Sequence, residues 1–382
     1  MEYLNVSQTR VSNKHTKVKG GKKMVLDFAK EAIENVSTHS INFDELRAGK
    51  ANIKVIGVGG CGCNTITWLF NKGINGATVY GVNTDALHLS VTKADEKLLI
   101  GKELTRGLGA GGKPKVGREA AKEALADLKK VVSGADMVFV VAGEGGGTGT
   151  GAVPVIAQLA KEAGAVVIGV VTMPFESERA RIDKAEFGLQ ELREVTDTTV
   201  VLDNNRLVDI AGQLPIEQAF AVANELVSTM VKGIVETITL PSLINLDYAD
   251  VSSIMKDGGV AVIGIGEADT ADRVNEAVRQ ALTHPLLDVD YKGASGALIH
   301  ITCGPDLKLE EFDHIGKIVS DNLNSEAQVI IGARISKEFM GKVRVITIMT
   351  GVKSPYVLGN EIEQAHSAPA KEMSDLGIEV WR

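Results

Sequence analysis

Short runs of aliphatic and β-branched residues alternate with helical patterns through the first half of the chain. The strand-like runs lie at residues 53–58, 77–83, 136–143, 165–173 and 199–204. Helices are predicted between them, from about residue 64, through residues 119–132 and from about residue 151. Strands separated by helices of this length predict a parallel sheet with helices on both faces.

The hydrophobic pattern changes after Pro215, where one long apolar-periodic helix begins and continues to about Thr239. The helix is too long to be another crossover between strands, so we interpret it as a link between two domains. The sequence after it predicts a smaller α+β domain with four strands and two helices. The strands are expected at residues 259–268, 296–303, 327–335 and 342–350, and the helices near 271–282 and 309–322.

The two ends of the chain lack the hydrophobic pattern of the middle. The first 23 residues carry six basic residues against one acid, which predicts a mobile basic tail. An amphipathic helix with a connector is expected next, and the far end is a polar linker closing in the apolar peptide LGIEVWR, which we expect to dock on a partner. The predicted segments are the tail (1–23), the amphipathic helix (24–50), the α/β domain (51–214), the long helix (215–240), the α+β domain (241–354) and the linker with its docking peptide (355–382).

Composition narrows the classes of function. With 382 residues, 44% of them hydrophobic and 24% charged, the chain is long enough for two globular domains. The net charge of −8 argues against a nucleic-acid binder, which needs a basic face. No apolar run approaches the ~20 residues that span a bilayer, and the start lacks a secretory signal, so a cytoplasmic protein is expected. The three Cys and seven His show no metal-ligand spacing, and we predict no protein metal site.

A glycine-rich loop follows the first predicted strand. Residues 57–64 read GVGGCGCN, formally a G-x-G-x-x-G motif at the start of a helix. Glycines there let backbone N–H groups approach a phosphate at the positive end of the helix. Taken alone, the motif also fits a dinucleotide site with Asp85 on a ribose, or a tight turn that binds nothing.

Two more glycine stretches favour a nucleotide with several phosphates. Residues 143–151 read GEGGGTGTG between another strand and another helix, and residues 107–112 read GLGAGG. Three such loops at the carboxyl edge of one sheet suit a nucleoside di- or triphosphate better than a dinucleotide. The sequence G-x-x-x-x-G-K-[ST] is absent, which excludes a Walker-type P-loop.

The stretches GVGGCGCN, NTDA, GLGAGGKP, GEGGGTGTGA and NLDYADV have the order and spacing of FtsZ, the prokaryotic relative of tubulin, which the chain resembles over about residues 50–355. The resemblance implies a tubulin/FtsZ-like α/β fold, in which the long helix joins a GTP-binding domain to the smaller domain. It also implies a GTPase that polymerises head to tail in the cell-division ring and hydrolyses GTP to GDP between subunits. The basic start and the segment near Glu178 favour an archaeal type.

The resemblance assigns roles to residues of the glycine loops. Gly60, Cys61 and Asn64 are implied to contact phosphates and base, and Gly109, Ala110 and Gly111 to face the γ-phosphate. The main phosphate cradle is implied to be Gly145, Gly146, Gly147, Thr148, Gly149 and Thr150. The threonine hydroxyls also have a structural interpretation, since threonine caps helix N-termini.

A second group is implied to hold the ribose and the base. Glu178 and Arg181 fit the family's Glu and Arg only with a single-residue gap, so a surface ion pair is the alternative. Asn204 takes the position of an Asn that contacts ribose and base. Phe220 and Asn224 lie one turn apart on the long helix, as stacking on guanine and reading its edge require. Without the family, Phe220 would be read as ordinary core.

Asp247 and Asp250, in the loop after the long helix, are the implied catalytic residues, with Asn245 orienting the loop or the water. In the family this loop enters the next subunit, where its carboxylates position the water that attacks the γ-phosphate. Read without the family, Asp250 is a helix N-cap and Asp247 an exposed loop acid. Mg²⁺ is expected to bridge the β- and γ-phosphates without a protein cage.

Two alternative functions are weighed against this one. An NAD-dependent oxidoreductase is supported only by the first glycine loop and Asp85, and a nucleotide-binding scaffold with little turnover only by the gap near Glu178. The expected partners are other copies of the chain, and a membrane anchor or division protein recruited by the terminal peptide at mid-cell.

Overall fold

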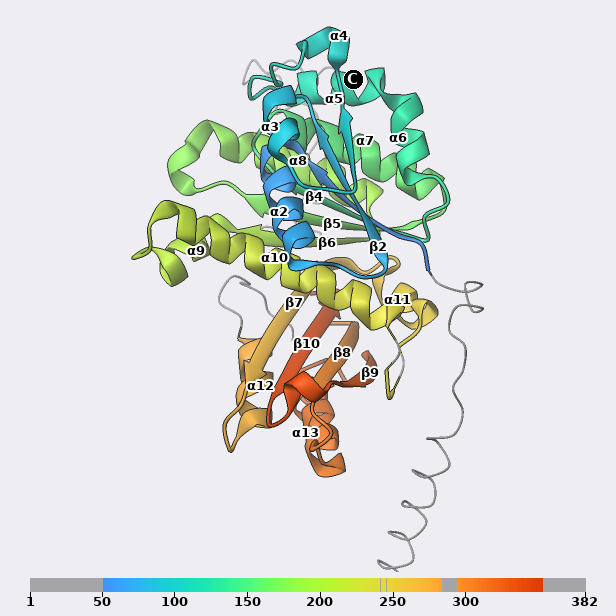
Figure 1. Cartoon of the computed structure of the whole chain (residues 1–382), viewed down its shortest axis with the longest axis vertical. Helices are drawn as coiled ribbons and strands as arrows, with labels where there is room; N and C mark the ends of the chain where they lie inside the picture. The colour runs from blue at the N-terminus through green and yellow to red at the C-terminus, as the bar shows by residue number, and fades with distance from the viewer. Residues whose placement is uncertain (1–50, 241, 245, 284–293, 353–382) are drawn as a thin grey trace, which may run out of the picture. The chain divides into compact units, whose positions relative to one another are not determined.

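The computed structural model describes residues 51–240, 242–244, 246–283 and 294–352. The predicted basic tail, amphipathic helix and docking peptide lie outside these residues, as does Asn245. The strands of the described residues form one sheet in the order β3-β2-β1-β4-β5-β6-β7-β10-β8-β9 (Figure 1).

The first part of the sheet is built from parallel strands, as the alternating pattern predicts. Its elements are β1 (Ile53–Val58), α2 (Gly59–Lys72), β2 (Ala77–Asn83), α3 (Ala86–Val91), β3 (Glu96–Leu99), α4 (Lys102–Thr105), α5 (Pro114–Glu123), α6 (Leu125–Val132), β4 (Met137–Gly143), α7 (Thr148–Glu162), β5 (Val166–Met173), the 3-10 helix η2 (Glu176–Arg181), α8 (Ile182–Val195), β6 (Thr198–Asp203) and α9 (Asn204–Ala211).

The long helix α10 (Ile216–Thr239) leads into the second part of the sheet. This part contains α11 (Tyr248–Met255), β7 (Gly259–Ala268), α12 (Arg273–Leu282), β8 (Gly296–Cys303), α13 (Leu309–Ser320), β9 (Gln328–Ile335), the 3-10 helix η4 (Lys337–Phe339) and β10 (Val343–Thr350). Strand β10 lies antiparallel between β7 and β8, so the second part is mixed, in agreement with the predicted α+β pattern.

Some predicted helix bounds are wrong. The first helix begins at Gly59 rather than near residue 64, and α7 begins at Thr148 rather than near residue 151. The helix expected through residues 119–132 is two helices, because the backbone at Ala124 leaves the helical region. Both early starts lie in glycine-rich sequence, which has a low helix propensity and hides a helix from sequence analysis.

Alternate residues of the parallel strands feed two separate cores. In β1, Ile53 and Val55 face the layer of α2, α9, α10 and α11, whereas Ile56 and Val58 face α5, α6, α7 and α8. All four side chains are at most 1% exposed. Burial on both faces explains why these strands are mostly apolar along their whole length rather than alternating apolar and polar.

The core on the α10 side also contains residues of the second part of the sheet, among them Ile263, Leu298 and Ile346. Strand β6 pairs with β7 over Thr198–Val200, which joins the two parts into one sheet. The expected domain boundaries therefore stay a prediction. No helix in the described part of the chain is both long enough and apolar enough to cross a membrane.

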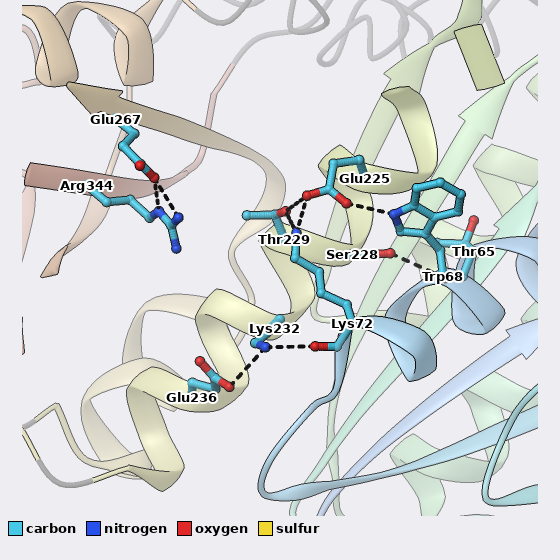
Figure 2. Close-up of polar contacts among 10 residues, drawn as sticks. All are labelled: Thr65, Trp68, Lys72, Glu225, Ser228, Thr229, Lys232, Glu236, Glu267 and Arg344. Atoms are coloured by element: carbon cyan, nitrogen blue, oxygen red, sulfur yellow. Dashed lines mark hydrogen bonds and ion pairs between the residues drawn. The ribbon is translucent and has the colours of Figure 1, made fainter. Parts of the chain in front are cut away.

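Polar contacts fasten α10 along α2 (Figure 2). Glu225 of α10 forms an ion pair with Lys72, and Trp68 donates its indole N–H to the same carboxylate at 2.7 Å. Ser228 donates to the carbonyl of Thr65 at 3.3 Å. Because α2 begins at the first glycine loop, these contacts fix that loop relative to the long helix.

Candidate nucleotide site

A cavity of about 340 Å³ lies where β1, β4, β5 and β6 end, at the carboxyl edge of the parallel strands. Its volume falls within the range typical of small-molecule sites. It is lined by Val58, Gly60, Cys61, Gly143, Glu144, Gly146, Gly147, Thr148, Gly149, Thr172, Pro174, Phe175, Glu178, Arg181, Asn204 and Phe220. Ten of these are predicted nucleotide contacts, and they come from both glycine loops, η2, α9 and α10.

The glycines of the first loop have different tasks. Gly59 has φ +72°, and a Cβ there would lie 2.9 Å from the backbone N of Gly149, so the two glycine loops touch. At Gly62 a Cβ would collide with the carbonyl of Val141. A Cβ on Gly60 would meet no atom within 4 Å, which leaves the space over this residue open on the cavity side.

The second loop delivers the N-terminus of α7 to the cavity. The N-cap position is Gly147, without a side-chain cap, so the interpretation of Thr148 or Thr150 as the N-cap is wrong. The Thr148 hydroxyl instead bonds to that of Thr84 at 2.7 Å. Uncapped N–H groups and the helix dipole make this end attractive to an anion.

The third glycine stretch packs against the cradle but does not line the cavity. A Cβ on Gly147 would lie 2.8 Å from the Cβ of Ala110, so the two loops are in close contact. Gly109 donates its N–H to the carbonyl of Thr84 at 3.1 Å. Gly109, Ala110 and Gly111 are not among the residues that line the cavity.

The opposite wall combines an ion pair with two aromatic rings. Arg181 donates to Glu178 at 2.8 Å, and both residues line the cavity. The Phe175 and Phe220 rings meet edge to face, with centroids 6.0 Å apart. Phe220 is 40% exposed, so it is not an ordinary core residue. Because Phe220 also lines the cavity, its ring can contact a flat ligand there.

Four other predicted contacts lie outside the cavity lining. The side-chain oxygen of Asn224 accepts from Thr65 at 2.9 Å, and that of Asn64 contacts the ring of His88 at 3.1 Å. Thr150 is buried in α7, and Gly145 packs against Arg181 with φ +84°.

Sequence analysis missed Phe175, Thr172 and Glu144 as cavity residues. Each lies close to the carboxyl end of a buried strand, and Glu144 is a charged residue within a glycine run. Their position near the ends of predicted parallel strands was the sequence signal that could have identified these residues.

The predicted catalytic acids form a capping box at the start of α11. Asp247 is the N-cap and accepts from the N–H of Asp250 at 2.9 Å, while Asp250 accepts from the N–H of Asp247 at 3.1 Å. The interpretation of Asp250 as the N-cap is therefore wrong, although Asp247 is exposed as expected.

The structure gives Asp85 a structural role. It caps α3 by accepting from the N–H of His88 at 2.9 Å, and this weakens the dinucleotide alternative. Among the described residues, no group of three or more His, Cys, Asp or Glu side chains is arranged to hold a metal ion.

Comparison with known proteins agrees with this geometry. Residues 52–212 match the Tubulin/FtsZ family, GTPase domain, and residues 259–353 match the FtsZ family, C-terminal domain. Cell division protein FtsZ 2 of Methanocaldococcus jannaschii is 52% identical, over 92% of this chain and 93% of that protein. Cell division protein FtsZ 2 of Haloferax volcanii is 52% identical over 87% and 84%. A solved M. jannaschii FtsZ dimer superposes with a TM-score of 0.76 at 50% identity, covering 81% of this chain and 90% of that one.

Proposed function

Because the chain belongs to the Tubulin/FtsZ family, we propose that it is the GTPase of a cell-division filament whose hydrolytic site is completed by a second copy of the chain. It binds GTP and hydrolyses it to GDP. The relatives named as cell division proteins support a place in the division ring at mid-cell, in the cytoplasm.

The position of the two half-sites at opposite ends of α10 supports a shared active site. Phe220, near the start of the helix, lines the cavity, and the helix ends at Thr239, shortly before Asp247. At 1.5 Å per residue, Phe220 and Thr239 are about 28 Å apart along the axis. Tyr248, the residue after Asp247, donates its hydroxyl to the carbonyl of Asp136 at 2.8 Å, just before β4 begins and hence at the sheet edge opposite the cavity. Asp247 and Asp250 therefore cannot reach a phosphate in their own cavity, whereas a second copy stacked head to tail would bring its acids to it.

The cradle supplies the charge stabilisation that phosphoryl transfer requires. N–H groups of the glycine loops and the start of α7 face the phosphates. The capping box occupies one oxygen of each of Asp247 and Asp250, so the other oxygen can accept from the attacking water. Asn245 would orient this loop. Mg²⁺ would bridge the β- and γ-phosphates and neutralise their charge.

The nucleoside lies, in this proposal, between the phenylalanine pair and the start of α9. Phe220 stacks on guanine, and Asn204 and the Glu178–Arg181 pair hold the ribose side. Asn224 lies just outside the cavity lining and its side-chain oxygen accepts from Thr65, so it would read the base edge through its amide N–H groups. The thiol of Cys61 lies beside the phosphates.

Residues 355–382 keep their predicted role as a tether and docking peptide for a membrane anchor or division protein. This segment lies outside the described residues, so the proposal rests on its sequence, in which an apolar end follows a polar linker.

Phosphate release measured against protein concentration tests the shared site. The specific activity should rise steeply with concentration, together with sedimentation that requires GTP and is absent with GDP or without nucleotide. A specific rate that is the same in dilute and concentrated protein would refute the shared site. Assembly without any phosphate release would instead identify a scaffold.

A further inference from the structure

Glu144 is a buried carboxyl group directly beside the cradle. It follows β4, is 5% exposed, and neither of its side-chain oxygens has a hydrogen-bond partner within the described residues. An ionised carboxylate without partners is very costly to bury. The role described above for the cavity does not account for this residue.

The side chain of Glu144 is wedged between α7 and α8. A Cβ on Gly188 of α8 would collide with the Oε2 of Glu144 and with the methyl group of Thr150 in α7. The Glu144 N–H donates to the carbonyl of Thr172 at 2.9 Å, which fixes the backbone at this point. The next residue, Gly145, turns with φ +84° into the cradle. The side chain therefore anchors the first residue of the phosphate loop.

The surroundings favour the neutral acid. The pKa of Glu144 is raised to about 7, mainly by burial and in smaller part by the negative charge of Glu191. The nearby Thr150 hydroxyl acts in the opposite direction, although it forms no hydrogen bond to the carboxyl in this geometry. Glu191 is itself paired with Arg118 of α5. The Cys61 thiol, from α2, also lies close enough to the carboxyl for the charge of Glu144 to raise the pKa of the thiol.

Two positive groups lie near the loop that follows Glu144. The backbone and Cβ of Arg181 pack against Gly145, and its guanidinium is paired with Glu178. The positive end of α7 attracts an anion, but bound phosphates would compete for it.

We propose that Glu144 is a positioning residue that holds the phosphate cradle as a neutral acid, so that nucleotide binding takes up a proton. The proposal rests on the cradle binding the phosphates of GTP and GDP, as proposed above. Phosphates bring negative charge to the loop that Glu144 anchors, and like charges disfavour ionisation of the acid. By reciprocal linkage, ionised Glu144 weakens binding, and the Kd rises up to tenfold for each pH unit above neutrality.

Titration calorimetry with GDP at pH 8, in buffers of different ionisation enthalpy, counts the protons. At this pH the phosphates of GDP are already ionised, so uptake reports on the protein. Wild type should take up a large part of one proton per GDP, and Glu144→Gln and Glu144→Met should take up none. The Met variant avoids burying an unpartnered amide. Glu162→Gln, at the exposed C-terminal end of α7 and away from the cradle, is the matched control and should behave as wild type.

Thermal unfolding without nucleotide gives a second measurement. Since the folded-state pKa of Glu144 is raised, its proton stabilises the native state below pH 4.5 and this contribution is lost as the pH rises to about 7. Wild type should lose stability across this range relative to Glu144→Gln. Equal proton uptake in wild type and both variants would refute the proposed role of Glu144 but would leave the cradle as the nucleotide site. Failure of wild type to bind GDP at any pH would overturn the cradle as well.

Discussion

Replacing Asp247 by Asn or by Ala separates the structural role of the acidic loop from its chemical role. As the N-cap of α11, Asp247 accepts a hydrogen bond from the N–H of Asp250. Helix α11 buries Val251, Ile254 and Met255 in the same core as α10. Fraying of its first turn should therefore lower the unfolding free energy of the fold. Loss of an N-cap costs about 1 kcal/mol, whereas Asn caps almost as well as Asp.

We therefore expect Asp247→Ala to lower the unfolding free energy by about 1 kcal/mol, and Asp247→Asn by a few tenths at most. Hydrolysis should fall in both variants by about a hundredfold or more, because neither offers a carboxylate to the attacking water. GTP binding should be unchanged, since the cavity lies at the far end of α10. Urea unfolding, nucleotide titration and phosphate release measure the three quantities.

Mixing two inactive variants tests whether the site is shared. Gly146→Asp places a negative charge in the cradle at a position where a Cβ meets no atom within 4 Å, so the fold should tolerate it. In an equal mixture with Asp247→Asn, about a quarter of the head-to-tail contacts join an intact cavity to an intact loop, and activity should return. If the mixture co-sediments but releases no phosphate, or if Asp247→Asn hydrolyses at the wild-type rate, the reasoning is wrong.

Two further predictions concern a thiol and a histidine. N-Ethylmaleimide should modify Cys61, which is exposed, in preference to the buried Cys63 and Cys303. The reaction should be slow at neutral pH, because partial burial of the sulfur raises the pKa of the Cys61 thiol. GTP should slow the labelling further, and labelling at the same rate with and without GTP would place Cys61 outside the site. Burial and the nearby Arg334 lower the pKa of His300 to about 4, so the unfolded chain binds a proton below pH 6.5 that the folded chain excludes. Urea unfolding should show a loss of about 2 kcal/mol between pH 7 and pH 5 that His300→Asn lacks, and parallel curves for the two proteins would contradict it.

The strands were predictable because burial on both faces leaves a strong signal. Runs such as residues 53–58 and 77–83 are mostly apolar, despite Lys54 and Asn83, and their bounds agree with β1 and β2. The edge strand β3 was missed because it has four residues, two of them charged. The helices α3, α4, α8 and α9 were also missed; α8 has a glycine inside it, which packs against Glu144. A contact of that kind is set by the tertiary fold and has no local sequence signal.

The parts of the candidate site that are formed by backbone loops were predictable from the sequence. The directions of individual side chains were less predictable. The glycine loops reach the same cavity because parallel strands end at one edge of the sheet. The directions of Asn64 and Asn224 depend instead on their partners His88 and Thr65, which lie far away in the sequence. The capping box has a similar origin, since either aspartate fits an N-cap and only the backbone geometry assigns that position to Asp247.

The length of α10 gives the filament unequal ends. If every pocket is completed by a neighbour's loop, a row of n copies holds n − 1 working sites, because the pocket at one tip and the acids at the other have no counterpart. The subunit at the tip with the open pocket keeps its GTP, whereas the interior subunits hydrolyse theirs. A single long helix thus gives the assembly a direction and one terminus whose nucleotide outlasts the rest.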